Sequence, residues 1–157
     1  MSDFLFKLES LPLSLWIQSS DWGYPILLTF HSLGLGLLVG LLLVMDLRLL
    51  GYLKPLPLSG LSKFMPWVWV GFTANAISGV MLFMADATKD YYANSFRIKM
   101  ACIVIAVTIA VYINKTVLRK GGDAPITTPA KALAWVSIAS WAGAIIAGRL
   151  IAYLAQV

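Results

Sequence analysis

Four long apolar stretches constrain this chain more than any other feature of its sequence. A helix needs about 20 apolar residues to cross the hydrocarbon core of a bilayer, and each stretch is long enough to do so. We predict transmembrane spans at about residues 25–50, 64–85, 96–118 and 129–157. The predicted fold class is all-α: a four-transmembrane-helix bundle that forms a single membrane domain over residues 1–157.

The composition excludes a water-soluble globule. Hydrophobic residues make up 60% of the chain and charged residues 12%, whereas soluble domains contain about 45–50% and about 25%. The net charge of +5 comes from basic residues between the apolar spans, so it reports membrane topology, and no nucleic-acid partner is expected. The chain has no Ser-His-Asp set, C-x-x-C pair or phosphate-binding glycine loop. Hydrolysis and nucleotide chemistry are therefore without support.

Shorter segments flank and connect the spans. Residues 1–20 are too short to cross the membrane and predict a short interfacial helix, with Ser10 as its cap and Pro12 in its first turn. The linkers at residues 51–63 and 119–128 contain proline and glycine, which predicts loops. Tryptophan and tyrosine concentrate at membrane surfaces. One such surface is expected to hold Trp16, Trp22, Tyr91 and Tyr92.

The basic residues predict the orientation. The side with the first and third linkers carries seven Lys and Arg residues: Arg48, Lys54, Lys63, Lys115, Arg119, Lys120 and Lys131. The opposite side carries five: Lys7, Lys89, Arg97, Lys99 and Arg149. Because the cytoplasmic side holds the excess of positive charge, we expect a multi-pass protein of the bacterial inner membrane with both termini in the periplasm.

Small residues at helical spacing predict how the spans pack. Gly36 and Gly40 form a G-x-x-x-G pair on the first span, and Gly71 and Gly79 lie on one face of the second. Such faces let helices approach closely in lipid, where no hydrophobic force drives their association. A thin bundle with several such faces favours a homo-oligomer, by analogy with symmetric soluble assemblies.

His31 is an ionisable side chain inside the first span. It is the only histidine and lies six residues after Pro25, which is about 9 Å along a helix. An ionisable group at that depth predicts a functional site. The structural alternative is an imidazole that only forms a hydrogen bond with a neighbouring helix.

The same leaflet gathers the other groups that haem requires. Haem iron takes an imidazole and can take a thioether. His31 is the candidate axial ligand, Gly34 beside it leaves room for a flat ligand, and the cations for the propionates are Arg149, Arg97 and Lys99. The candidate thioether ligands are Met81, Met84 and Met100. Apolar packing explains the methionines equally, and snorkelling to the surface explains Arg97 and Lys99 more readily than Arg149.

Copper(I) would use the soft members of this set. Its ligands would be His31, the three methionines and Cys102, the only cysteine.

Asp46 and Arg48 lie at the cytoplasmic end of the first span with i,i+2 spacing. They therefore do not pair on one helix face, and we expect them to bond neighbouring helices or the linker.

Several stretches resemble a family of short bacterial four-helix integral membrane proteins without an assigned activity. They are residues 29–34 (TFHSLG), 46–51 (DLRLLG), 66–67 (PW), 96–99 (FRIK) and 148–153 (GRLIAY). More loosely, the chain is similar to four-helix b-type cytochromes and to the copper-resistance D membrane proteins. This resemblance implies that His31 is a haem or metal ligand. A single histidine departs from the cytochrome pattern and excludes bis-histidine ligation within one subunit.

Three functions follow, in order of preference. The first is a b-type haem-binding membrane protein for electron transfer within the bilayer, with a redox partner that the sequence does not name. The second is a copper-handling membrane protein. The third is a cofactor-free structural or assembly subunit of a membrane complex, in which His31 and Arg149 belong to a hydrogen-bond network.

Reporter fusions test the orientation. Alkaline phosphatase fused after Val157 should be active and a cytoplasmic reporter there inactive, because the positive-inside rule places this terminus in the periplasm. The same two reporters inserted after Lys120 should give the opposite pattern and serve as the control. An active cytoplasmic reporter at Val157 would reverse the topology and move His31 to the cytoplasmic leaflet.

Overall fold

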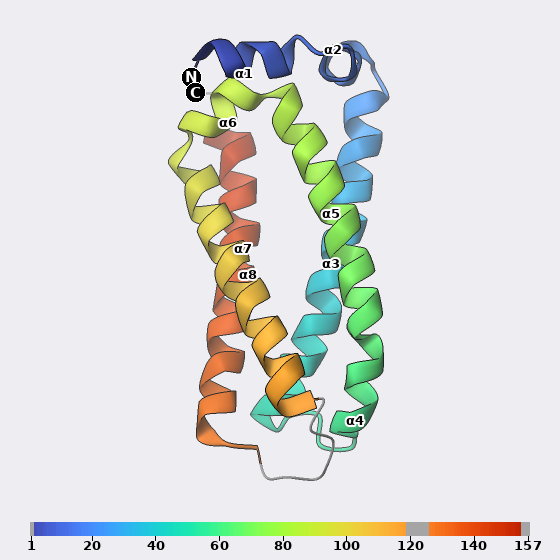
Figure 1. Cartoon of the computed structure of the whole chain (residues 1–157), viewed down its shortest axis with the longest axis vertical. Helices are drawn as coiled ribbons and strands as arrows, with labels where there is room; N and C mark the ends of the chain where they lie inside the picture. Colours follow the sequence, from blue (N-terminus) through green and yellow to red (C-terminus); the bar gives the residue numbers. More distant parts are fainter. Residues whose placement is uncertain (1, 119–125, 155–157) are drawn as a thin grey trace.

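Four long helices stand side by side in the computed structural model, which describes residues 2–118 and 126–154 (Figure 1). They are α3 (Gly23–Leu50), α5 (Met65–Ala85), α7 (Asn94–Ile113) and α8 (Thr128–Leu154). A π-helical turn, η2 (Asn114–Leu118), continues α7. All four are long and apolar enough to cross a membrane. The predicted four-helix fold is therefore confirmed, and the chain is a multi-pass membrane protein.

The predicted spans agree closely with these helices. Pro66 lies in the first turn of α5, as expected. The fourth predicted span was placed at residues 129–157, and α8 covers Thr128–Leu154. Residues 155–157 of that span, and residues 119–125 of the third linker, lie outside the described residues.

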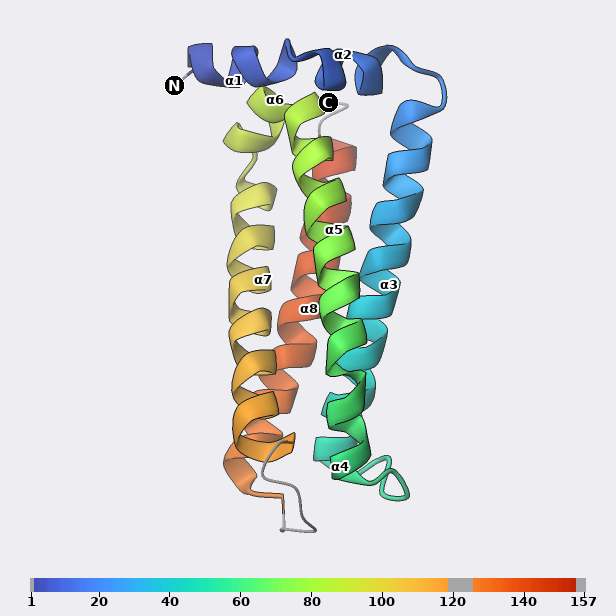
Figure 2. The same ribbon diagram turned by 45° about the vertical axis from the view of Figure 1, so that its right-hand side comes forward.

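The bundle is built from two pairs of helices. α3 packs along α5, α7 packs along α8, and contacts between α3 and α8 join the pairs. Figure 2 shows the two pairs side by side, α7 and α8 in one and α3 and α5 in the other. In both views the start of α3 and the end of α8 lie at the same end of the bundle.

Two short helices lie across that end of the bundle: α1 (Ser2–Glu9) and α2 (Pro12–Ser19) (Figures 1 and 2). Leu5 and Ile17 are buried. Here α1 contacts α5 and the short helix α6 (Ala87–Tyr92), and α2 contacts α3 and α5. The Gln18 amide Nε2 donates to the carbonyl oxygen of Ala85 at 2.8 Å. The helices are therefore attached to the bundle itself as well as suited to the membrane surface.

The predicted cap of the second short helix is wrong. The hydroxyl of Ser10 donates to the carbonyl of Lys7 at 2.9 Å, so it closes the end of α1. Leu11 is the N-cap residue of α2 and makes no side-chain cap bond. The reason is that the chain forms two helices here, and Ser10 lies in the turn between them.

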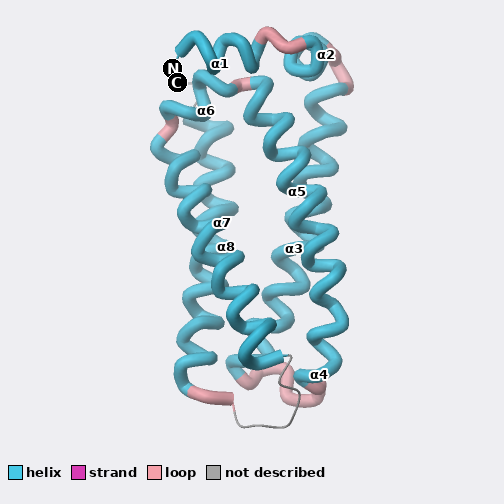
Figure 3. Tube along the Cα trace, in the orientation of Figure 1, coloured by secondary structure: helices cyan, strands magenta, loops and turns pink. Residues whose placement is uncertain are grey.

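Connections predicted as loops are partly helical (Figure 3). Residues 51–63 contain α4 (Leu58–Leu61) and the start of a 3₁₀ turn, η1 (Ser62–Phe64), and α6 (Ala87–Tyr92) lies between α5 and α7. α3 ends at Gly51, whose φ of 95° is left-handed and therefore suits glycine. Arg48 bonds the linker, as expected, because its Nε donates to the carbonyl of Leu56.

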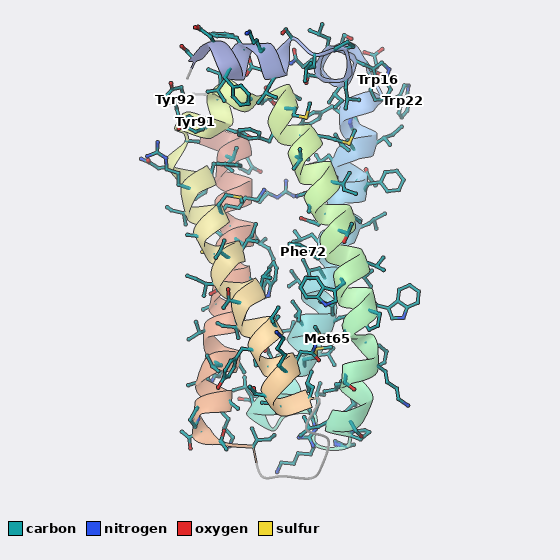
Figure 4. All side chains as sticks on the ribbon, viewed as in Figure 1. Trp16, Trp22, Met65, Phe72, Tyr91 and Tyr92 are labelled. Atoms are coloured by element: carbon teal, nitrogen blue, oxygen red, sulfur yellow. The ribbon has the colours of Figure 1, made fainter. Side chains whose placement is uncertain are left out.

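The hydrophobic core occupies the half of the bundle next to α4. From α3 it includes Leu38, Leu42, Met45 and Leu49. Met65 and Phe72 of α5 point towards it in Figure 4. In the other half, α3 buries no residue between Gly23 and Gly34, and α7 buries none before Ala106. The helices therefore pack less closely at the end that α1 and α2 cover.

Aromatic side chains gather at that less closely packed end. Figure 4 places Trp16 and Trp22 beside α2 and the start of α3, and Tyr91 and Tyr92 on α6. The four residues predicted to share one membrane surface therefore lie at the same end of the bundle.

α3 and α5 approach each other most closely at Gly34 and Gly71. A Cβ on Gly71 would lie 3.0 Å from the backbone N of Leu38 and 3.1 Å from the carbonyl O of Gly34. A Cβ on Gly34 would lie 3.1 Å from the backbone N of Asn75. Backbone atoms cannot rotate away as a side chain can, so a Cβ on either glycine would force the two helices apart by a few tenths of an ångström.

Gly36 and Gly40 play no such role within one chain. Both are exposed, and a Cβ on either would meet nothing within 4 Å. The expected packing of this pair therefore needs a second chain, and the homo-oligomer stays a prediction.

Replacement of Gly71 by alanine tests the α3–α5 contact. Gly71→Ala should lower the free energy of unfolding by about 1–3 kcal/mol relative to Gly40→Ala, because overpacking forces the two backbones apart. Thermal unfolding in mild detergent, followed by circular dichroism, measures the difference. Equal stability of the two variants would contradict the close contact.

Candidate functional site

His31 lies where α3 meets α5. Its Nδ1 is 2.9 Å from the hydroxyl Oγ of Ser78, and the imidazole is half-buried. His31 lies eight residues into α3, or about 12 Å from the start of the helix. The only histidine of the chain is therefore attached to the neighbouring helix within one leaflet.

Two further residues of α5 shape the surroundings of His31. Asn75 Nδ2 donates to the backbone carbonyl of His31 at 2.8 Å. A Cβ on Gly79 would lie 3.2 Å from Cε1 of the imidazole, so the ring packs where glycine leaves space. Asn75, Ser78 and Gly79 together determine where the ring can lie.

The hydrogen bonds of Ser78 determine which imidazole nitrogen carries the proton. The Ser78 hydroxyl lies 2.7 Å from the carbonyl of Ala74 and donates to it. A hydroxyl has one proton, so towards His31 its oxygen acts as an acceptor. Nδ1 of His31 is then the protonated nitrogen, and Nε2 keeps its lone pair. No hydrogen bond of Nε2 is found within residues 2–118 and 126–154.

Lys99 brings a positive charge to this region from α7. Its side chain is half-buried and lies 3.7 Å from the position that a Cβ on Gly148 of α8 would take. The ammonium group is close enough to act electrostatically on the imidazole of His31. Four helices thus contribute to one level of the bundle: His31 from α3, Ser78 from α5, Lys99 from α7 and Gly148 from α8.

The other predicted site residues are placed differently. Arg97 and Arg149 are exposed on the surface of the bundle. Gly34 is buried against the backbone of α5, so helix packing accounts for this glycine and α5 occupies the face that a flat ligand would need. Lys99, for which snorkelling is the simpler explanation from the sequence, is half-buried, and its charge acts on the imidazole.

The predicted copper ligands come from three helices: His31 from α3, Met81 and Met84 from α5, and Met100 and Cys102 from α7. Met100 is 44% exposed, and the Sγ of Cys102 lies 3.1 Å from the position of a Cβ on Gly143, at the α7–α8 contact. Met81 and Met84 are half-buried on α5. Among the described residues there is also no group of three or more His, Cys, Asp and Glu side chains that could hold a metal ion.

Sequence reasoning missed Ser78, the residue that orients the imidazole. Asn75 and Ser78 are polar residues three apart inside an apolar span, a spacing that places them on one helix face. That pattern marks a polar face on α5 but does not identify its partner on α3. Only the register of α3 against α5 does so.

Aromatic and acidic residues lie where α5, α6 and α7 follow one another. The rings of Phe83 and Phe96 stack with centroids 5.1 Å apart, which links the end of α5 to the start of α7. Burial and the neighbouring charge of Asp86 raise the pKa of Asp90 from 3.8 to about 6, while Lys89 and Lys99 oppose the rise. Asp90 therefore titrates close to neutral pH.

Stability should depend on this titration. A raised pKa means that the folded state prefers protonated Asp90, so its contribution is fully present below about pH 3.8 and is lost as the pH rises through about 6. Asp90→Asn should therefore melt at a higher temperature than the wild type at pH 8, with the difference vanishing towards pH 4. Asp21→Asn, an exposed aspartate at the same end, is the control. An Asp90→Asn protein less stable than the wild type at pH 8 would refute this account.

Comparison with known proteins gives a family without an assigned activity. No curated protein and no solved structure matches the chain. One family matches residues 24–154, which include all four long helices and every residue of the site described above. The chain belongs to the DUF6644 family, a family of unknown function.

Proposed function

We propose that this protein is a b-type haem-binding membrane protein that transfers electrons within the bilayer. The observation that carries the proposal is the orientation of His31 by Ser78. Histidines that ligate a metal almost always donate their other ring N–H to a hydrogen-bond acceptor, which holds the tautomer and the ring orientation. The Nδ1–Ser78 distance of 2.9 Å fits that pattern, and Nε2 is the nitrogen that would take the iron.

Cations in the same half of the bundle support the proposal. Lys99 acts on the imidazole electrostatically and lies against Gly148, so it is the first candidate to neutralise a propionate. Arg97 and Arg149 belong to the same leaflet and are exposed, where they could hold a propionate that reaches the surface. Bound haem would supply a one-electron couple whose potential depends on its axial ligands and surroundings.

Packing in this half is compatible with a bound group. α3 and α7 bury few residues there, and the side chains of His31, Phe83 and Phe96 are only half-buried. The chain has one histidine that would hold the iron. Any further protein ligand would come from Met81 or Met84, or from a second copy of the chain.

Two alternatives make different predictions. A structural role would use the same His31–Ser78 hydrogen bond to hold α3 against α5, without any cofactor. Copper handling would need Met100 and Cys102 to approach His31, and α7 makes no extensive contact with α3 among the described residues. We prefer the haem proposal for one reason. A hydrogen bond that only holds α3 against α5 would need neither an Nε2 without a partner among the described residues nor a cation nearby.

Absorbance at the Soret band, normalised to protein, tests the proposal. His31→Ala should abolish haem binding, because it removes the only imidazole. Ser78→Ala should keep the ligand but weaken haem retention about 10–100-fold, as loss of an orienting partner does. Lys99→Met and Arg149→Ala should leave the iron ligated while retention weakens, with the larger effect at Lys99.

Ser32→Ala is the matched control, since Ser32 is next to His31 but exposed, and its hydroxyl bonds only the backbone of its own helix. This variant should keep the wild-type spectrum. Full haem occupancy in the His31→Ala protein would refute the assignment of His31 as the iron ligand. A wild-type protein that never acquires a Soret band, with a His31→Ala variant that is merely less stable, would support the structural alternative.

A further inference from the structure

Three of the four long helices carry the same two kinds of side chain at the end of the bundle next to α4. A lysine is exposed near the tip of the helix, and an exposed aromatic residue lies three or four positions further in. These lysine–aromatic pairs are Lys63 and Trp67 on η1 and α5, Lys115 and Tyr112 on η2 and α7, and Lys131 and Trp135 on α8. Figures 1 and 2 show the three helix ends together, at the opposite end of the bundle from α1 and α2.

The two members of each pair point the same way, towards lipid. Residues three or four positions apart share a helix face, and η1 and η2 are continuous with α5 and α7. The rings of Trp67, Tyr112 and Trp135 are 59%, 54% and 57% exposed. These rings are not packed between the helices of the bundle. Because all three helices are long and apolar enough to cross a membrane, their exposed faces contact the surrounding lipid.

The spacing within a pair matches the thickness of a phospholipid headgroup layer. Three or four residues correspond to about 4.5–6 Å along a helix. A bilayer is about 40–45 Å thick with its headgroups and about 30 Å without them, so each headgroup layer is about 5–8 Å thick. Indole and phenol rings concentrate in this layer, and lysine side chains extend outwards to its charged surface. One headgroup can therefore contact both members of a pair.

The charges around the pairs favour an anionic lipid. Residues 45–65, 112–118 and 126–135 contain one acidic side chain, Asp46, which is 3% exposed. No carboxylate on the surface of these segments therefore competes with a lipid for the three lysines. Arg48 and Lys54 add positive charge at the same end. Groups of four to eight basic residues beside a transmembrane helix are typical of sites that bind anionic lipids.

The opposite end of the bundle lacks this arrangement. Arg97 and Arg149 are exposed there, but only methionine, alanine and isoleucine lie three or four positions deeper along their helices. Acidic residues are also mixed with the basic ones at that end: Asp3, Glu9, Asp21, Asp86 and Asp90. A preference for anionic lipid is therefore expected at the α4 end.

We propose that each lysine–aromatic pair binds the headgroup of one anionic phospholipid. The lysine ammonium group contacts the phosphate. The aromatic ring lies one turn deeper, beside the glycerol backbone, where its N–H or O–H can donate to lipid oxygens. This inference depends neither on haem binding at His31 nor on which side of the membrane the α4 end faces.

Native mass spectrometry of the full chain in mild detergent tests the proposal, because it counts bound lipids. The probes are dioleoyl phosphatidylglycerol and dioleoyl phosphatidylcholine, which share their acyl chains and their phosphate but differ in net charge. Phosphatidylglycerol should bind in up to three copies and about tenfold more tightly, since each basic residue near the surface contributes about fivefold to affinity for anionic lipid. The difference should shrink as the ionic strength rises.

The lysines are tested by a charge-matched pair of variants. Lys63→Gln combined with Lys131→Gln should weaken phosphatidylglycerol binding about fivefold or more and leave phosphatidylcholine binding unchanged. Lys7→Gln combined with Lys89→Gln removes the same charge from exposed positions at the opposite end. This control should keep the wild-type affinity for both lipids.

The aromatic rings should affect binding differently. Trp67→Leu combined with Trp135→Leu should weaken both lipids, because the glycerol backbone is common to them, while the preference for phosphatidylglycerol remains. Trp16→Leu combined with Trp22→Leu is the control at the opposite end, where the two indoles are also exposed. It should keep the number of tightly bound phosphatidylglycerol molecules.

Four results would overturn the inference. Equal affinity of the wild type for the two lipids would exclude an anionic preference. Wild-type phosphatidylglycerol binding in the Lys63→Gln/Lys131→Gln protein, or an equal loss in its control, would place the lipids elsewhere. Displacement of phosphatidylglycerol by an equal concentration of inorganic phosphate would indicate a site for soluble anions instead of lipids.

Discussion

The contact between two glycines, Gly34 on α3 and Gly71 on α5, determines the geometry of the candidate site. Backbone atoms of the two helices meet there so closely that a Cβ on Gly71 or Gly34 would lie 3.0 or 3.1 Å from the backbone of the other helix. In lipid, helix association depends on such packing and on interhelical hydrogen bonds. The contact sets the register of the two helices, and that register places His31 opposite Ser78 and Gly79. The hydrogen bond from Asn75 to the His31 carbonyl, 2.8 Å long, reinforces it.

The two halves of the bundle differ in what holds them together. The half next to α4 has an aliphatic core that runs through α3, α5 and α7. The other half has fewer buried residues and is closed by α1, α2 and α6, through contacts such as the 2.7 Å bond from the backbone N–H of Thr88 to Glu9. Polar groups can lie between the helices there because dense aliphatic packing does not exclude them. A cofactor site is more readily built in such a region than in a filled core.

Polar atoms inside the bundle occur at two separate levels. At one level His31, Ser78 and Lys99 come from three helices, and the hydrogen bonds of Ser78 leave Nε2 of the imidazole unpaired. At the other, Asp46 of α3 and Trp141 of α8 are buried, and each has a polar atom without a hydrogen-bond partner among the described residues. α3 contributes to both levels, because it packs against α5 and against α8. A single long helix thus carries polar groups of the bundle interior at two levels.

The sequence by itself determined the spans, the all-α class and the residues worth suspecting. The length and hydropathy of each span are local properties of the sequence, and the thickness of the bilayer determines the length that is needed. A single histidine inside such a span can likewise be recognised from the sequence alone. Tertiary structure decided which residues meet. Ser78 is the partner of His31, Lys99 is half-buried whereas Arg149 is exposed, and Gly34 is a packing residue. The sequence also could not predict that Asp46 and Trp141 line the same cavity between α3 and α8, because these residues are 95 positions apart in the chain. The physical reason is that lipid imposes the same apolar character on every outward face. Composition therefore marks which segments enter the membrane, whereas helix register and rotation, set by close contacts between backbones, select the side chains that face one another.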